Sequence, residues 1–308
     1  MKRINYIFKS CLLFVFVYTG NVFSQIEPNF SLYRFNALAI NPAQAGAQNY
    51  LDVSALNRWQ WVGIDGAPKT FSMSCNTPFK ERYGAGLVFI NDANGPVSNT
   101  KIGINGAVNF SITQKLRISF GLLGSMENMT VDLSRLTTIN KNDAQFAQNM
   151  TTGNKFNGGW GILLYSKKGY FGFSQPNIVK NDFNNKNNTN VHRVNHYFMY
   201  AGYNHDFTEN LQFRPSTLIR LANDAPFSMD INAVVSYKRT FDVGFTYHHR
   251  DALGLILGYA ITRNFYVGYA YDIPFSAIVN GTKQTHELAL RYKFLNAYKS
   301  VSNPRYFN

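Results

Sequence analysis

The feature that most constrains this chain is an alternation of apolar and polar residues with a period of two, repeated along most of its length. The pattern is clear in KIGINGAVNF (101–110), SMDINAVVSYK (228–238) and HELALRYKF (286–294). A period of two is typical of a β-strand that turns one face to an apolar medium. Beyond the first residues, no apolar run is long enough for a helix to cross a membrane. We therefore expect an all-β fold.

The position of the charges distinguishes two all-β architectures. A soluble sandwich buries its apolar faces between sheets, whereas a membrane barrel turns them to lipid, where an Arg or Lys at the midplane costs roughly 2–4 kcal/mol. The faces that we assign as outward carry no Asp, Glu, Lys or Arg. A sandwich also avoids buried charge, so this favours a barrel without deciding it. The residues assigned to the inward faces are Lys101, Arg117, Arg214, Arg220, Asp230, Lys238, Asp242, Glu287, Arg291 and Lys293.

Aromatic residues also favour a membrane barrel. They gather near segment ends, as in HYFMYAGY (196–203) and YVGYAYD (266–272). Amphipathic rings suit the two membrane–water interfaces. A sandwich core would use fewer Tyr, because each buried hydroxyl needs a partner.

The connections between segments alternate in length, as the long extracellular loops and short periplasmic turns of an outer-membrane barrel do. Long connections are expected at 58–69, 91–99, 127–157, 175–195 and 273–283. Short ones are expected at 78–82, 111–115, 166–168, 206–210, 239–240 and 262–264. One connection, 249–251, is short on the long side.

We therefore predict a transmembrane antiparallel β-barrel of about 14 strands, an even number that places both chain ends in the periplasm. Residues 25–49 precede the first strand and must lie in the periplasm or in the lumen. The expected strands are 50–57, 70–77, 83–90, 100–110, 116–126, 158–165, 169–174, 196–205, 211–220, 228–238, 241–248, 252–261, 265–272 and 284–294.

Residues 1–24 are typical of a secretory signal peptide, with a basic start, the apolar stretch CLLFVFVY and small residues before a cleavage site near Ser24/Gln25. Removing its three basic groups from the 30 in the chain leaves 27 against 17 acidic groups, a net charge of +10. Such a protein attracts anionic lipid, polysaccharide or an acidic protein partner, and export excludes nucleic acid. Cys75 is then the single cysteine, so no internal disulfide forms.

No motif predicts catalysis, a cofactor or a metal. His192 and His196 do not converge on a strand, and the glycines at 84, 86, 103, 106, 158 and 159 open no helix. We find no Ser/His/Asp or carboxylate constellation that can be assembled from the sequence. The polar loops 127–157 and 180–190 are candidate binding surfaces. The inward basic groups outnumber the inward acids that we assign, which indicates either an anionic ligand or an ordinary solvated lumen.

The stretch PNFSLYRFNALAINPAQAGAQNY, followed by ALNRWQWVGIDGAPKTFSMSCNTPF, resembles the PorP/SprF family of the type IX secretion system of Bacteroidota. The resemblance covers roughly residues 28–80 and the closing NPRYF (303–307), with Glu27 as the acidic residue near the mature start. Its matching positions are Phe30, Tyr33, Phe35, Asn36, Asn41, Pro42, Ala43, Gly46, Arg58, Trp59, Gln60, Trp61, Gly66, Ala67, Pro68 and Thr70.

The resemblance implies a non-enzymatic outer-membrane barrel that supports the secretion or surface anchoring of an adhesin-like cargo through its carboxy-terminal domain, or the gliding machinery. Its partners would be that cargo, other type IX secretion components and outer-membrane lipid; a passive or substrate-specific pore is the alternative. The expected organisation is a signal peptide (1–24), a signature segment (25–49), a barrel (50–294) and a periplasmic tail (295–308).

The signature segment would either dock a partner or only plug the barrel. We expect replacement of Trp59 or Trp61 by Ala to disturb docking or loop packing more than insertion, and charge reversal of the inward arginines to weaken cargo display without reducing assembly. The candidate partner-binding residues are Phe30, Tyr33, Phe35, Asn36, Asn41, Pro42, Gly46, Arg58, Trp59, Gln60, Trp61, Arg214, Arg220 and Arg291.

Overall fold

The computed structural model describes residues 29–80, 82–132, 150–151, 153–179, 182–184, 190–192, 195–222, 227–275 and 284–295. The predicted signal peptide, nearly all of the predicted tail, and much of the loops 127–157 and 180–190 lie outside the described residues.

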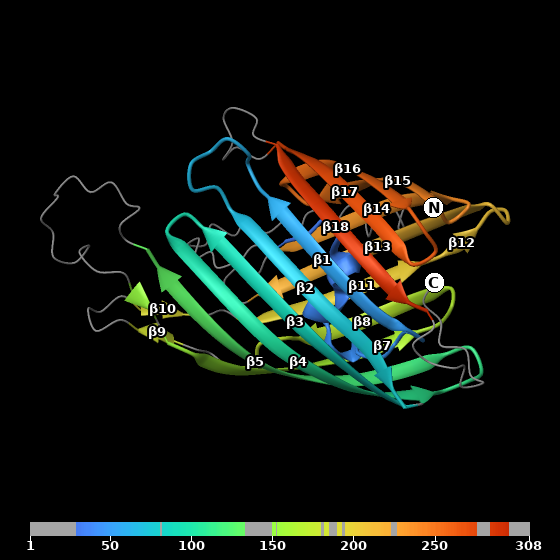
Figure 1. The fold of residues 1–308 in the computed structure, drawn as a ribbon, viewed down its shortest axis with the longest axis horizontal. Helices are drawn as coiled ribbons and strands as arrows, with labels where there is room; N and C mark the ends of the chain where they lie inside the picture. The colour runs from blue at the N-terminus through green and yellow to red at the C-terminus, as the bar shows by residue number, and fades with distance from the viewer. Residues whose placement is uncertain are drawn as a thin grey trace, which may run out of the picture.

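The described chain forms a closed antiparallel β-barrel (Figure 1). Its sheet has sixteen strands; two of them, β6 (Met150–Thr151) and β12 (His205–Asp206), are two residues long and pair on one side only, and the other fourteen close the barrel. Thirteen pairings join these strands to their neighbours in sequence, and a fourteenth pairing, of the first strand with the last, completes the ring. The fourteen are β1 (Leu51–Trp59), β2 (Lys69–Phe79), β3 (Tyr83–Asn94), β4 (Val97–Ser111), β5 (Arg117–Val131), β7 (Lys155–Tyr165), β8 (Gly169–Gln175), β11 (His196–Tyr203), β13 (Leu211–Ala222), β14 (Ser228–Tyr237), β15 (Phe241–His248), β16 (Ala252–Ala260), β17 (Phe265–Pro274) and β18 (Thr285–Phe294).

Each of the fourteen expected strands is confirmed, with boundaries that differ by a few residues. Leu51 at the start of β1 pairs with Phe294 at the end of β18, so the first strand enters and the last strand leaves at the same end of the barrel. We call this the turn end, because its connections are short, and the opposite end the loop end. A further hairpin, β9 (Asp182–Asn184) with β10 (Asn190–His192), stands in the connection between β8 and β11.

Apolar side chains cover the outside of the barrel, as the alternation predicts. Ile104, Leu122 and Phe245 are 65%, 71% and 65% exposed, and in each strand their neighbours in sequence point inward. Among the outward positions of the fourteen strands, the one Asp, Glu, Lys or Arg is Lys69, at the first position of β2. Such a wall is compatible with hydrocarbon on every side.

Two expectations from the sequence were wrong, one about a connection and one about the face of a residue. The connection 91–99 is not a long loop: β3 runs to Asn94, β4 begins at Val97, and Gly95 with φ +58° allows a tight turn between them. The polar residues that suggested a loop extend the hydrogen-bonded ladder instead. Lys238 does not face the lumen; it lies exposed in the turn after β14 with φ +51°.

Candidate functional site in the barrel lumen

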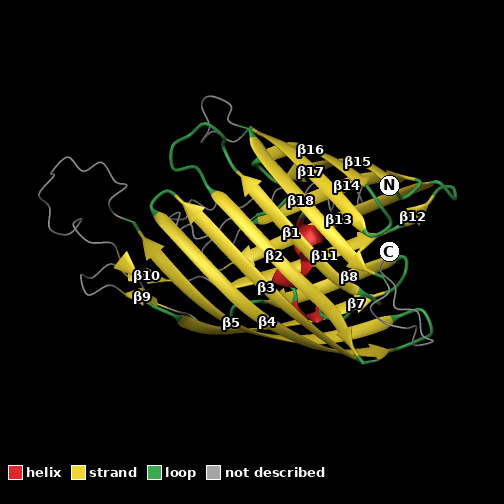
Figure 2. Cartoon of the chain, viewed as in Figure 1, coloured by secondary structure: helices red, strands yellow, loops and turns green. Residues whose placement is uncertain are grey.

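Residues 29–50 lie inside the barrel, and we call them the luminal segment. They form the short helices η1 (Tyr33–Asn36), α2 (Ala37–Ile40) and η2 (Pro42–Gln44), which Figure 2 shows in red within the ring of strands. No helix in the described part of the chain is long and apolar enough to cross a bilayer. Of the two expected locations, periplasm and lumen, the described residues of the signature segment lie in the lumen.

The luminal segment runs from the loop end to the turn end. Ser31 contacts Glu287, the third residue of β18, and Asp272, which lies two residues before the end of β17. At the other end, Gly46 donates its amide to the side chain of Asn76 near the turn that follows β2 (2.8 Å). The chain thus traverses the lumen once before it enters β1.

Apolar packing holds the luminal segment against the inner face of the wall. Phe30, Tyr33 and Ile40 belong to the same buried cluster as Leu163 of β7 and Phe198 of β11. Burial raises the pKa of the Tyr33 phenol well above its usual value, so this ring is neutral. A water-filled lumen would leave these wall residues exposed, whereas Leu163 and Phe198 are 0% and 4% exposed.

Wall glycines let the luminal segment approach the strands closely. A Cβ added at Gly84 would lie 2.1 Å from the carbonyl oxygen of Ala45, and one at Gly121 would lie 2.2 Å from the amide nitrogen of Ala43. No side chain fits at these distances, so the shape of the wall is matched to the backbone of the segment. Asn41 fixes the turn between the helices: its side chain accepts from the amide of Ala43 (2.8 Å) and donates to the carbonyl of Ile162 (2.9 Å).

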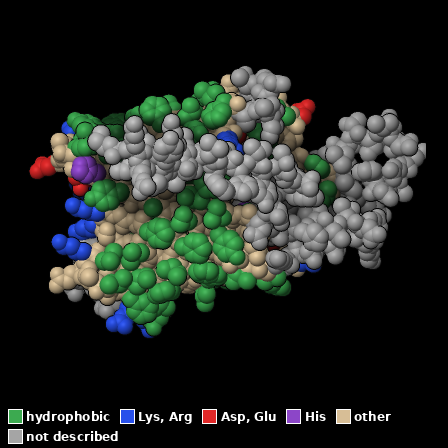
Figure 3. Space-filling model, turned by 180° about the vertical axis from the view of Figure 1, so that it is seen from behind, with side chains coloured by type: hydrophobic (Ala, Val, Ile, Leu, Met, Phe, Trp, Pro, Cys, Tyr) green, Lys and Arg blue, Asp and Glu red, His purple; other side chains and the backbone are tan. Residues whose placement is uncertain are grey.

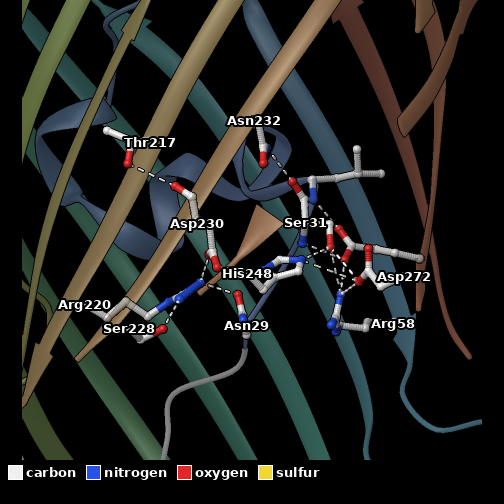
Figure 4. Close-up of polar contacts among 12 residues, drawn as sticks. Asn29, Ser31, Arg58, Thr217, Arg220, Ser228, Asp230, Asn232, His248 and Asp272 are labelled. Carbon is white, nitrogen blue, oxygen red and sulfur yellow. Dashed lines mark hydrogen bonds and ion pairs between the residues drawn. The ribbon is translucent and has the colours of Figure 1, made fainter. Parts of the chain in front are cut away.

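A charged cluster anchors the loop-end part of the luminal segment (Figure 4). Glu287 accepts hydrogen bonds from the amides of Ser31 (2.9 Å) and Leu32 (2.7 Å). Arg58 donates to Glu287 (2.8 Å), to Asp272 (2.9 Å) and to the hydroxyl of Ser31 (3.1 Å). A carboxylate that accepts two successive backbone amides recognises the main chain itself, whatever its side chains.

The same cluster extends across the lumen. His248 contacts Asp230 through Nδ1 (2.6 Å) and the hydroxyl of Ser31 through Nε2 (2.9 Å). Arg220 pairs with Asp230 and with the side chain of Asn29, and Asn232 donates to the carbonyl of Ser31 (2.8 Å). The charged cluster is thus Arg58, Arg220, Asp230, His248, Asp272 and Glu287, and each of these side chains is at most 3% exposed.

Ser31, His248 and Asp230 have the connectivity of a Ser–His–Asp triad, but their hydrogen bonds oppose catalysis. Ser31 donates its hydroxyl proton to Asp272 (2.7 Å), so His248 must supply the hydrogen in its own contact with that hydroxyl. Because Nδ1 also faces a carboxylate, both ring nitrogens are donors and the ring is an imidazolium, which cannot act as a general base. With a charged His248, the three cations of the charged cluster balance its three carboxylates. Ser31 is also 0% exposed, so no substrate reaches its hydroxyl.

Most remaining charges of the lumen are also paired. Lys101 lies 3.3 Å from Glu127, Arg214 pairs with Asp242, and Arg291 makes two bonds to Asp52 (2.7 and 2.8 Å). The inward basic groups of the described strands still outnumber the inward acids, but by fewer than the sequence indicated. Asp52, Glu127 and Asp272, which the sequence did not assign to the inward face, supply the missing negative charge. The described residues contain no group of three or more His, Cys, Asp or Glu placed to hold a metal ion.

A family model for the "Type IX secretion system membrane protein PorP/SprF" matches residues 22–292. The chain belongs to the PorP/SprF family. No curated protein matches it.

Solved structures similar to this PorP/SprF protein include the Ralstonia pickettii toluene transporter TbuX, at 11% identity and a TM-score of 0.49 over 84% of this chain and 93% of that chain. The CymD monoaromatic hydrocarbon channel is similar at 11% identity and a TM-score of 0.49, over 85% and 94% of the two chains. Omp33 of Acinetobacter baumannii is similar at 11% identity and a TM-score of 0.45, over 81% and 100%. The PorP/SprF chain is an outer-membrane β-barrel of the type IX secretion system.

The structure places eleven of the fourteen predicted partner-binding residues in the lumen of this PorP/SprF barrel. Arg58 and Arg220 hold the loop-end part of the luminal segment, and Phe35 packs against the ring of Tyr266 (5.3 Å between centroids). Arg214 and Arg291 also face the lumen, but nearer the turn end. The predicted residues that belong to the luminal segment itself are Phe30, Tyr33, Phe35, Asn36, Asn41, Pro42 and Gly46.

The other predicted residues lie elsewhere. Trp59 is on the outer face at the loop end of β1, opposite His286. Gln60 and Trp61 are in the β1–β2 loop, where Trp61 has φ +46° and donates its amide to Thr285 (3.3 Å). These three residues do not contact the charged cluster.

Sequence reasoning missed Ser31, His248 and Asp272 as members of one site. Two signals were available. Asp272 and His248 occupy inward positions at the loop ends of their strands. WGILLY (160–165) and YFMY (197–200) are apolar on both faces. A strand without a polar inward face indicates that something apolar fills the lumen.

Proposed function

We propose that this protein is a non-enzymatic component of the type IX secretion system that supports the secretion or cell-surface anchoring of a partner protein. The partner we favour is an adhesin-like cargo recognised through its carboxy-terminal sorting domain, and the gliding machinery is the related setting. The family assignment supports the secretory role. The cargo and the mode of recognition are inferences that go beyond it.

The observation that carries the proposal is the occupied lumen. The luminal segment is held along its length by apolar packing, by wall glycines matched to its backbone and by the charged cluster, in which the positive and negative charges balance. This barrel uses its lumen to bind its own chain, which favours a role other than that of an open solute channel. The surfaces left for partners are then the loop end, the turn end and the outer wall.

Two measurements test the proposal. Purification of the protein from its own outer membrane, in mild detergent, should yield other type IX secretion components or a secreted protein with a carboxy-terminal sorting domain. Cells that lack this protein should retain that cargo or release it from the surface. Unchanged secretion and surface display of every such cargo would contradict the proposal.

A passive or substrate-specific pore is the second candidate function. In planar bilayers we expect the parent barrel to show little small-solute conductance and a variant lacking residues 29–46 to conduct, because the deletion empties the lumen. Steady conductance that the deletion leaves unchanged would favour the pore instead.

A further inference from the structure

The outer wall of β3, β4, β5 and β7 carries a groove on its lipid-facing surface. The groove has a volume of about 620 Å³. The side chains that line it point outward and are apolar, among them Tyr83, Val108, Phe120, Leu122 and Trp160. The inward-facing residues at its floor are small, and the luminal segment fills the lumen behind them at Gly84 and Gly121. The groove therefore opens only toward the membrane.

The groove exists because Gly106 stands between larger outward neighbours. In register, Gly106 of β4 pairs with Leu122 of β5, and Leu122 pairs with Trp160 of β7. A Cβ added at Gly106 would have no atom within 4 Å, so no protein group fills this space. A volume of this size lies within the range of sites that bind small molecules, about 300–1,000 Å³.

The groove lies on the turn side of the membrane. Its lining residues Val108, Phe120 and Ile162 are about three positions from the turn-end limits of their strands, a distance of about 10 Å at roughly 3.3 Å per residue. Short turns face the periplasm in outer-membrane barrels, so the groove faces the acyl chains of the periplasmic leaflet.

The turns beside the groove are basic. Lys and Arg side chains gather at this end of the barrel, on the left of Figure 3. The three turns that join β2 to β3, β4 to β5 and β7 to β8 carry Lys80, Arg82, Lys115, Lys167 and Lys168, all exposed. Their described residues include no acid, and the sequence of these turns adds only Glu81. Successive turns at this end of the barrel are two strands apart, and strands are spaced about 4.8 Å, so neighbouring turns stand about 10 Å from each other. The basic groups of the three turns therefore surround one position above the groove.

We propose that this face binds an anionic phospholipid of the periplasmic leaflet, with an acyl chain in the groove and the phosphate against the basic turns. Charge complementarity selects this occupant over a neutral lipid, because each Lys or Arg near the membrane surface adds attraction for an anionic headgroup. The apolar groove supplies the second requirement, a fixed place for one chain. The site does not depend on cargo binding and goes beyond the proposed secretory function.

The test uses the purified full-length mature protein, delipidated in detergent, with phosphatidylglycerol and phosphatidylethanolamine of equal chain length as probes. Native mass spectrometry measures how much of each lipid stays bound. We expect tighter binding of phosphatidylglycerol. Lys115→Gln with Lys168→Gln should weaken it about 25-fold, since each basic group contributes roughly fivefold. Gly106→Leu should reduce the binding of this lipid by filling the groove.

Matched controls on the opposite wall make the result specific. Lys238→Gln with Arg239→Gln removes the same charge from the β14–β15 turn, and Ala233→Leu adds similar bulk to the outer face of β14. These variants should bind phosphatidylglycerol as the parent does, and heat-modifiable gel mobility confirms that each barrel has assembled. Equal binding of the two lipids by the parent, or equal losses in the groove and control variants, would overturn the proposal. So would a lipoprotein anchor occupying the groove in the protein as purified from cells.

Discussion

The carboxylate of Glu287 accepts the backbone amide of Ser31 at 2.9 Å, across 256 positions of sequence. The last strand of the barrel thus binds the chain that precedes the first. This contact is buried, charge-assisted and accompanied by a second one to Leu32 (2.7 Å). It makes the luminal segment part of the folded barrel and not an appendage of it.

Replacing Glu287 by Ala should destabilise the barrel. Removing this carboxylate leaves two backbone amides without their acceptor and leaves Arg58 with Asp272 as its one carboxylate partner. Losses of about 3–5 kcal/mol are typical when one member of a buried charge group is removed. Urea unfolding in lipid vesicles, followed by tryptophan fluorescence, measures the effect. Glu209→Ala, which removes the same charge from an exposed turn, is the control and should change stability little. Equal stability of the two variants would show that the charged cluster contributes nothing.

Replacing Gly84 by Val should displace the luminal segment, because a Cβ there would lie 2.1 Å from the Ala45 carbonyl oxygen. We expect faster protease cleavage within residues 29–50 and higher conductance, while the strands stay assembled. Gly124→Val is the matched control, since a Cβ at that outward position meets nothing within 4 Å. A protected segment in the Gly84 variant would contradict the close fit.

Charge reversal at Arg291 should lower barrel stability, in contrast to our expectation from sequence that assembly is unaffected. Arg291 makes two bonds to Asp52, so Arg291→Glu places two carboxylates together in the wall. The double exchange Arg291→Glu with Asp52→Arg restores the pair and should recover part of the loss. The temperature at which the folded gel band converts to the unfolded one provides the readout. No recovery in the double variant would mean that the pair does not act as a unit.

Ser31 should not react with a fluorophosphonate probe. The hydroxyl of Ser31 donates to Asp272, and His248 donates from both ring nitrogens and so cannot take up the proton. Ser31 is also 0% exposed. Mass spectrometry of the probe-treated protein, compared with Ser31→Ala, checks this directly. Stoichiometric labelling of the parent alone would contradict this and would indicate that Ser31 is a reactive nucleophile.

Trp61→Ala should reduce recovery of partner proteins without changing heat-modifiable mobility. Trp61 lies in the β1–β2 loop, near the exposed side chains of Val62 (45%) and Ile64 (42%), outside the strand ladder. Trp59→Ala is the comparison, because that side chain is on the outer wall and belongs to the membrane interface. Wild-type partner recovery with Trp61→Ala would exclude this loop as a docking surface.

The architecture of the barrel could be predicted from sequence because each strand must keep charge out of lipid, and that requirement acts locally on alternate residues. Strand β4 illustrates this, since Ile102 and Ile104 point outward and Lys101 inward, as expected. The turn at Gly95 was missed because beyond the membrane both faces are polar, so the period-two pattern that marks a strand disappears.

The luminal site was harder to predict because its partners come from opposite ends of the chain. Nothing near Ser31 in the sequence indicates that it meets Glu287, His248 and Asp272. The acids Asp52 and Asp272 stand at inward positions, but only the closed ring places them beside Arg291 and Arg58. The assignment of residues such as Asn41 and Arg58 came from the family signature, and alternation alone did not supply it.

The final strands of the barrel also supply the carboxylates that the luminal segment requires. A ribosome that stops short of β17 releases a chain in which Ser31 has neither Asp272 nor Glu287 to bind and Arg58 remains an unneutralised charge. The loop-end part of the luminal segment can therefore be anchored only after the last two strands have been made, which ties the first described residues of the chain to its final strands.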